Sequence, residues 1–314
     1  MNKIAIKFAT AASTAALVVS SFATPLLATT VEISGNGSDS SNAVQVNQSN
    51  TTTVTQNNSA NISNNVSVNA NTGSNDAKDN TGGDVSIETG DASANVGVSN
   101  TVNSNQASVN GCCGNDVTLT IKGNGADHGN NDSNTIEFGS TNVNAISQNN
   151  SANLSNNVDV DLKTGKNDAN DNTGGDVSVE TGDADATVTV SNNANANWAA
   201  ITGSGNGGGL AVEISGNGSD STNAVEVGLA SINEISQNND ANISNNIDVD
   251  GNTGYNDAED NTGGEVSIDT GDADATVSVS NMANFNAAEL EGCGCVDDLD
   301  VLVKGNGSDS ETTA

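Results

Sequence analysis

The chain has 314 residues, of which 40 are Asp or Glu and only 7 are Lys or Arg, so its formal net charge at pH 7 is −33. Arginine is absent. Because proteins bind phosphate backbones through cationic side chains, this composition excludes nucleic acid as a partner. Only 33% of the residues are hydrophobic, and a chain of this kind stays disordered unless its sequence carries a regular pattern.

Residues 1–28 are predicted to form a signal peptide. Two lysines precede an alanine-rich apolar run, and small residues then lead to cleavage positions after Ala23 or Ala28. The run is too short to cross a hydrocarbon core of about 30 Å, so we expect no transmembrane segment in the mature chain. The prediction is a secreted protein, extracellular or held at the cell surface.

An internal repeat of about ninety residues follows the signal peptide. The segment DNTGGDVSIETGDA at 79–92 returns with few changes at 171–184 and at 260–273. An Asn-rich element precedes each copy, and a short strand with a Gly-Asn-Gly turn opens each unit. The sequence thus divides into repeat 1 (31–118), repeat 2 (119–211), repeat 3 (212–299) and a partial repeat or C-terminal cap (300–314).

Apolar and polar residues alternate within each repeat, which is the period of a β-strand. In the second repeat one face carries Ile146, Gln148, Asn150, Ala152, Leu154, Asn156, Val158, Val160 and Leu162. Gly-Gly, Thr-Gly-Asp and Asn-Asn sequences separate the strands as turn formers. The pattern predicts an all-β fold.

Two all-β architectures fit this pattern: a repetitive β-solenoid and tandem β-sandwich domains. A sandwich core needs large side chains, but the mature chain has only Phe138, Trp198, Tyr255 and Phe285, and none recurs at a fixed repeat position. In a solenoid, neighbouring coils cover a thin core and inward Asn or Gln form hydrogen-bonded ladders. The solenoid is therefore favoured, with about 20 residues per coil and a rod roughly 65 to 70 Å long.

The Asn-rich element QNNSANISNNVSV and the segment NTGGDVSIETGDA, beginning at Gln56 and Asn80, resemble uncharacterised secreted repeat proteins of candidate-phyla-radiation bacteria. This resemblance covers the mature chain and implies no established activity. Gln and Asn at strand positions also give a fainter similarity to curlin repeats, although the spacing differs. That second resemblance implies self-assembly.

Acidic loops in the second and third repeats place oxygen donors at alternate positions, as a hard cation with six to eight oxygen ligands requires. The predicted calcium ligands are Asp168, Asn170, Asn172, Asp176, Asp257, Glu259, Asn261 and Glu265. Thr173 and Thr262 stand where an EF-hand loop has glycine, and Lys78 weakens the first-repeat copy. The alternative interpretation is that these loops are solubilising turns.

The four cysteines, Cys112, Cys113, Cys293 and Cys295, are expected to form disulfides in an exported protein. With short coils, a bridge between the two cysteine pairs would span ~20 Å, beyond the reach of a disulfide. The bonds are therefore expected to be local or to join two chains.

No group of residues indicates catalysis, and the single histidine, His128, has no counterpart in the other repeats. The sequence predicts a secreted acidic repeat protein that acts as a structural or adhesive component, calcium-stabilised if the acidic loops bind the ion. Its partners would be further copies of itself or cell-surface glycans and proteins. The alternative is a secreted polysaccharide hydrolase or lyase on a β-helix, with paired carboxylates as the reacting groups.

Overall fold

The computed structural model describes residues 4–10, 16–21, 29–35, 41–110, 116–125, 133–203, 208–291 and 296–314. Every regular element in these ranges is a β-strand, and every strand pair is parallel. The strands are β1 (Ile4–Thr10), β2 (Ala16–Ser21), β3 (Thr29–Ser34), β4 (Asn42–Asn71), β5 (Val85–Glu88), β6 (Ala92–Asn110), β7 (Val117–Lys122), β8 (Ser133–Lys163), β9 (Val177–Glu180), β10 (Ala184–Thr202), β11 (Gly208–Ser215), β12 (Thr222–Asn252), β13 (Val266–Asp269), β14 (Ala273–Leu290), β15 (Val296–Lys304) and β16 (Glu311–Thr313). The predicted all-β solenoid is confirmed.

Each repeat forms one complete coil of the solenoid. Ala60 in β4 pairs with Ala152 in β8, which pairs with Ala241 in β12, so like residues stack directly over one another. Strands β3 to β6 make the first coil, β7 to β10 the second and β11 to β14 the third, while β15 and β16 lie on β11 and β12.

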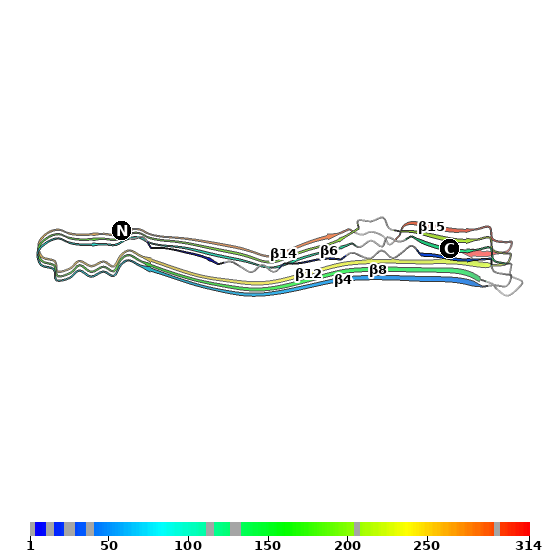
Figure 1. Ribbon diagram of the computed structural model, residues 1–314, viewed down its shortest axis with the longest axis horizontal. Coiled ribbons are helices and arrows are strands. Elements are labelled where there is room, and N and C mark those ends of the chain that lie inside the picture. The colour runs from blue at the N-terminus through cyan, green and yellow to red at the C-terminus, as the bar shows by residue number, and fades with distance from the viewer. Residues whose placement is uncertain are drawn as a thin grey trace.

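The expectation of about 20 residues per coil was wrong. The Asn-Asn pairs predicted to form turns lie inside the long strands β4, β8 and β12. Their side chains continue the alternation between the inner and the outer face of the strand. The expected rod, with its long axis along the direction in which the coils stack, was wrong too, because the molecule is longest along its strands (Figure 1). The 31 residues of β12 span about 100 Å at 3.3 Å per residue.

Two long layers of strands face each other across a thin core (Figure 1). One layer is the sheet β4–β8–β12–β16, and the other contains the sheets β6–β10–β14 and β3–β7–β11–β15. The small sheet β5–β9–β13 lies where the chain turns from one layer to the other. Small and branched apolar residues fill the core, for example Val160 and Leu162 against Val188 and Val190.

One irregularity, at equivalent positions in the three coils, bends β6, β10 and β14. Asn103, Asn195 and Asn284 have φ values of 58°, 61° and 62° and fall out of the strand pairing. Asparagine tolerates this left-handed conformation better than other side chains do. Because the bend recurs at the same place in each coil, the coils still stack without a gap.

Buried side-chain amides join the two layers. A zigzag of hydrogen bonds runs from Asn105 to Asn150, from Asn150 to Asn197 and from Asn197 to Asn239, each with a donor–acceptor distance of 2.7 Å. Asn105, Asn150 and Asn197 are at most 1% exposed. The predicted inward ladders are therefore present, and each of these amides hydrogen-bonds to another in its own coil or in a neighbouring coil, as a buried polar group must.

Strands β1 and β2 lie in the predicted signal peptide and pair with β6, on the side opposite β10. The signal peptide itself stays a prediction. The four cysteines and His128 lie outside the described residues. The ~20 Å separation expected between the cysteine pairs assumed short coils and was wrong, but two strand spacings of about 4.8 Å still exceed the reach of a disulfide, so local or inter-chain bonds stay a prediction.

Candidate functional site

The acidic loops connect the long strands to the small sheet and stack in register like the strands. Single backbone bridges join Asp76 to Asp168 and Asp168 to Asp257. Glycine is required where the loops approach most closely, because a Cβ on Gly175 would collide with the carbonyl oxygen of Gly83 in the coil below. The predicted calcium ligands therefore lie in two stacked loops, directly above a third of the same shape.

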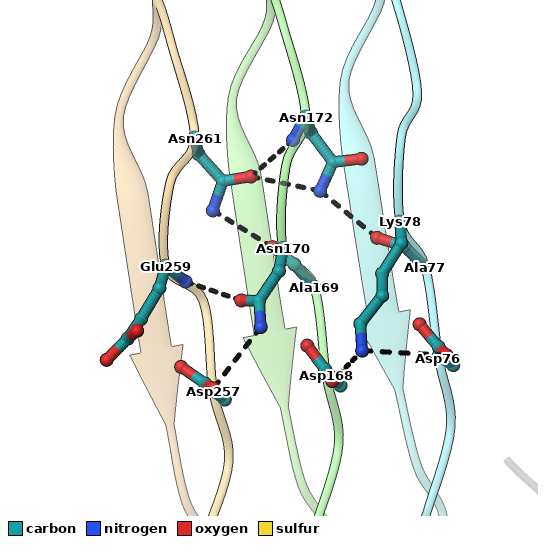
Figure 2. A network of polar contacts seen from close by, with 10 residues as sticks. All are labelled: Asp76, Ala77, Lys78, Asp168, Ala169, Asn170, Asn172, Asp257, Glu259 and Asn261. Atoms are coloured by element: carbon teal, nitrogen blue, oxygen red, sulfur yellow. Dashed lines mark hydrogen bonds and ion pairs between the residues drawn. The ribbon is translucent and has the colours of Figure 1, made fainter.

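Two of these predicted ligands, Asn172 and Asn261, form a ladder between coils (Figure 2). Oδ1 of Asn172 accepts hydrogen bonds from the backbone and side-chain nitrogens of Asn80, at 3.0 and 2.8 Å. Oδ1 of Asn261 accepts the equivalent pair from Asn172, at 2.9 and 3.0 Å. Nδ2 of Asn172 also donates to the carbonyl oxygen of Ala77 at 3.1 Å. These amide oxygens hold the loops in register.

A second group of predicted ligands lies on the solvent side of this ladder. Nδ2 of Asn170 donates to Oδ2 of Asp257 at 3.2 Å, and its Oδ1 accepts the backbone N–H of Glu259. The Glu259 carboxylate points away from the other labelled side chains (Figure 2). The structure thus brings Asn170 and Asp257 together, whereas Glu259 contributes its backbone.

Lys78 is the cation of this network. Its Nζ forms an ion pair with Asp168 and lies 3.8 Å from Oδ2 of Asp76 (Figure 2). Its hydrogen bond to the Asp168 carboxylate, opposed by a weaker desolvation effect, raises the pKa of Lys78. Because Asn170 and Glu259 stand at its position in the other coils, one lysine offsets the stacked acids of the first two coils.

Of the remaining predicted ligands, Asp176 caps a backbone group of the next coil, and Glu265 contributes its backbone N–H to that contact. Oδ1 of Asp84 accepts the backbone N–H of Asp176 at 3.0 Å, and Oδ1 of Asp176 accepts that of Glu265 at 2.8 Å. Among the described residues no three His, Cys, Asp or Glu side chains are grouped to hold a metal ion. Calcium binding at the eight predicted residues stays a prediction.

A shallow depression of about 330 Å³ lies over β7, β11 and β15. Three carboxylates line it, those of Asp116, Asp298 and Asp300, beside Val117 and Leu210. Oδ1 of Asp116 accepts the backbone N–H of Gly209 at 3.0 Å, so this carboxylate is held at the rim. This grouping could not be predicted from the sequence, because its members come from different repeats.

No protein family, curated protein or solved structure matches the chain. Within the described ranges we find no helical segment able to cross a lipid bilayer.

Proposed function

We propose that the protein is a secreted, acidic structural or adhesive component of the cell surface or extracellular space. One observation carries this proposal: in-register stacking turns the outer face of the β4–β8–β12 sheet into rows of identical polar groups. Nδ2 of Asn153 donates to Asn61 and Nδ2 of Asn242 donates to Asn153, each at 3.1 Å. A parallel row joins Asn65, Asn157 and Asn246.

Such a face offers similar weak polar contacts at alternate residues along strands of about 100 Å, and neighbouring coils repeat them one strand spacing apart. Repeated weak sites gain strength through avidity, which suits adhesion to glycans or proteins of a surface. The rows consist of side-chain amides, groups that hydrogen-bond to sugar hydroxyls. Further copies of the chain are a second kind of partner, and calcium bound at the acidic loops would reduce repulsion between the coils.

Immunogold labelling of intact cells tests the location. We expect gold particles on the outer surface or on extracellular material before any permeabilisation. Labelling that occurs only after permeabilisation would contradict the proposal. An antibody to a cytoplasmic protein, applied to the same cells, serves as the control for intact envelopes.

Adhesion is tested with a double variant, Asn153→Lys with Asn157→Lys, which interrupts both rows. We expect weaker binding of the purified protein to cell-surface glycans. Asn193→Lys is the matched control, because Asn193 is exposed in β10 on the opposite layer. Equal binding by all three proteins would show that the amide rows do not mediate adhesion.

The depression lined by Asp116, Asp298 and Asp300 favours one alternative, a polysaccharide hydrolase. Paired carboxylates can act as acid and base in glycoside cleavage. Reducing-end release from acidic and neutral polysaccharides, lost in Asp298→Asn, would support this alternative. No release from any polymer tested would remove it.

A further inference from the structure

The third coil exposes side chains that the second coil buries. Ile268 is 45% exposed and Leu290 is 56% exposed, whereas their partners below, Val179 and Ile201, are 0% exposed. Both positions face the core in the second coil. In the described part of the chain, only β15 and β16 lie above the third coil, over β11 and the first three residues of β12. Most of the core at this end therefore faces solvent.

A glycine in the third coil indicates what covers this exposed core. Gly73 and Gly165 must be glycine, because a Cβ on either would collide with the carbonyl oxygen of the glycine in the coil above, Gly165 and Gly254 respectively. Gly254 has no atom within 4 Å of its Cβ position, and its φ is not positive. Nothing within the described chain requires glycine at 254, but a further coil would.

We propose that the first coil of a second copy of this chain stacks on the third coil, so that copies join end to end. The strands of the first coil have the same register as those of the second and place like residues at core positions, for example Gln56 with Gln148 and Val96 with Val188. A further β4 would therefore lie on β12 as β12 lies on β8, beyond the first three residues of β12, which β16 covers. Open parallel strands offer backbone N–H and C=O groups for this pairing.

The buried amide zigzag continues across such a joint. Asn197 donates to Asn239 of the coil above, and Asn239 donates to Asn286 at 2.8 Å. The next acceptor in this sequence is the position that Asn58 occupies in the first coil, where Nδ2 of Asn58 already donates to Asn105 at 2.7 Å. The second copy supplies that Asn58.

When two copies join, β15 of one copy and β3 of the other compete for the same position. By register, β15 lies where β3 would lie in the coil above, since Val31, Leu119, Val212 and Val301 stack in one column. Residues 35–40 and 305–310 are both Gly-Asn-Gly-Ser-Asp-Ser. With nine residues against six, β15 is the longer strand. We therefore expect β15 to stay in this position and to pair with β7 of the second copy. The strand β3 of the second copy is then displaced.

The N-terminal segment decides which form assembles. Strands β1 and β2 pair with the edge of β6 that would receive β14 of the other copy. The exported chain, from which the leader has been removed, therefore assembles, whereas the chain that keeps residues 1–28 does not. Because every coil carries stacked carboxylates, salt that screens their repulsion also favours the joint.

Gly254→Ala tests the proposal on protein purified after export. The new Cβ has free space in the single chain, but it would collide with the next copy as a Cβ on Gly165 would collide with Gly254. We expect the unaltered protein to form concentration-dependent linear assemblies in sedimentation velocity and negative-stain electron microscopy at 0.5 M NaCl. The variant should stay monomeric and keep the melting temperature of the unaltered protein.

Gly228→Ala is the matched control. Gly228 also lies in the third coil with free space at its Cβ position, but the equivalent residue in the first coil is Asn47, so this place in the stack accepts a side chain. It should assemble like the unaltered protein. Monomers of unaltered protein at all concentrations, or equal assembly by Gly254→Ala, would overturn the proposal. Surface labelling of cells is unaffected by either result, so failure here is distinct from failure of the proposed function.

Discussion

Nε2 of Gln148 donates a hydrogen bond of 2.7 Å to Oε1 of Gln56, a residue ninety-two positions earlier, and both side chains are 0% exposed. Nε2 of Gln237 donates in turn to Oε1 of Gln148 at 2.8 Å. Each of these nitrogens also reaches a backbone carbonyl of the opposite layer. This column ties together three coils and both layers, so it fixes the register on which the fold depends.

Replacing Gln148 by Leu should lower the free energy of unfolding by about 1 to 3 kcal/mol. The substitution keeps an apolar stem of similar size but leaves Gln56 and the carbonyl oxygen of Trp198 without their buried donor. Urea denaturation measures the change. Asn149→Ala is the control, because Asn149 is exposed and pairs only at the surface with Asn238. An equal effect of the two substitutions would show that the buried column has no special role.

Gly175→Ala should destabilise the protein by at least about 1 kcal/mol more than Gly83→Ala. Both glycines have positive φ, +100° and +107°, so the conformational strain of alanine is similar. Only the Cβ at 175 collides with the coil below, at Gly83; the one at 83 has no atom within 4 Å. The comparison of two melts isolates the contact between coils. Matching melting temperatures would contradict the close stacking of these loops.

Lys78→Glu should lower the melting temperature at low salt, and the difference should shrink at 0.5 M NaCl. The substitution removes the cation beside Asp168 and places a carboxylate next to Asp76 and Asp168. Since pairing raises the pKa of Lys78, its contribution to stability is fully present below the unfolded pKa and is lost as pH rises through the folded value. The part of the effect that comes from the lost cation should therefore persist at pH 7 and fade above pH 10 or so, whereas the repulsion by the new carboxylate remains. A difference that does not depend on salt would rule out this electrostatic explanation.

Millimolar calcium should raise the melting temperature if the acidic loops bind the ion specifically. Extracellular calcium sites have dissociation constants of about 10⁻⁴ to 10⁻³ M, and binding at 100 times that constant adds roughly 2.7 kcal/mol per site. Sodium at equal ionic strength is the control for general screening. Asp257→Asn tests the site itself, because Asp257 contacts Asn170 within the loop. Identical melts with calcium, chelator and sodium would leave the loops as solvated turns.

The sequence predicted the strands, the repeat and the inward amides, because alternation is a local pattern and the repeated segments are visible in the sequence itself. It did not predict the coil length. Asn-Asn pairs are turn formers in most chains, but Asn64 and Asn65 here point to opposite faces of one strand, one toward Asn100 and one toward Asn157. Which of the two roles they take depends on whether an identical strand lies alongside, and that is a long-range property.

The acidic loops were predicted in part. Alternate oxygen donors were visible in the sequence, but Asn172 and Asn261 use their amides to hold adjacent coils together. The depression beside Asp116 and Asp298 combines residues far apart in the chain. Nothing in the sequence distinguishes Gly254 from the other glycines, and only the stacked coils show that its equivalents need glycine for close approach.

Each ninety-residue repeat forms a single coil, and nitroxide labels at Ser63 and Ser155 test this most directly. Both residues are exposed and are paired in register. The labels are placed in a variant whose four cysteines are replaced by serine and whose melting temperature matches that of the unaltered protein. Their Cα atoms should lie about 4.8 Å apart, and strong dipolar broadening is expected. Labels at Ser63 and Ser147, about 26 Å apart along the strand, should give narrow lines. Narrow lines from the first pair would contradict the account.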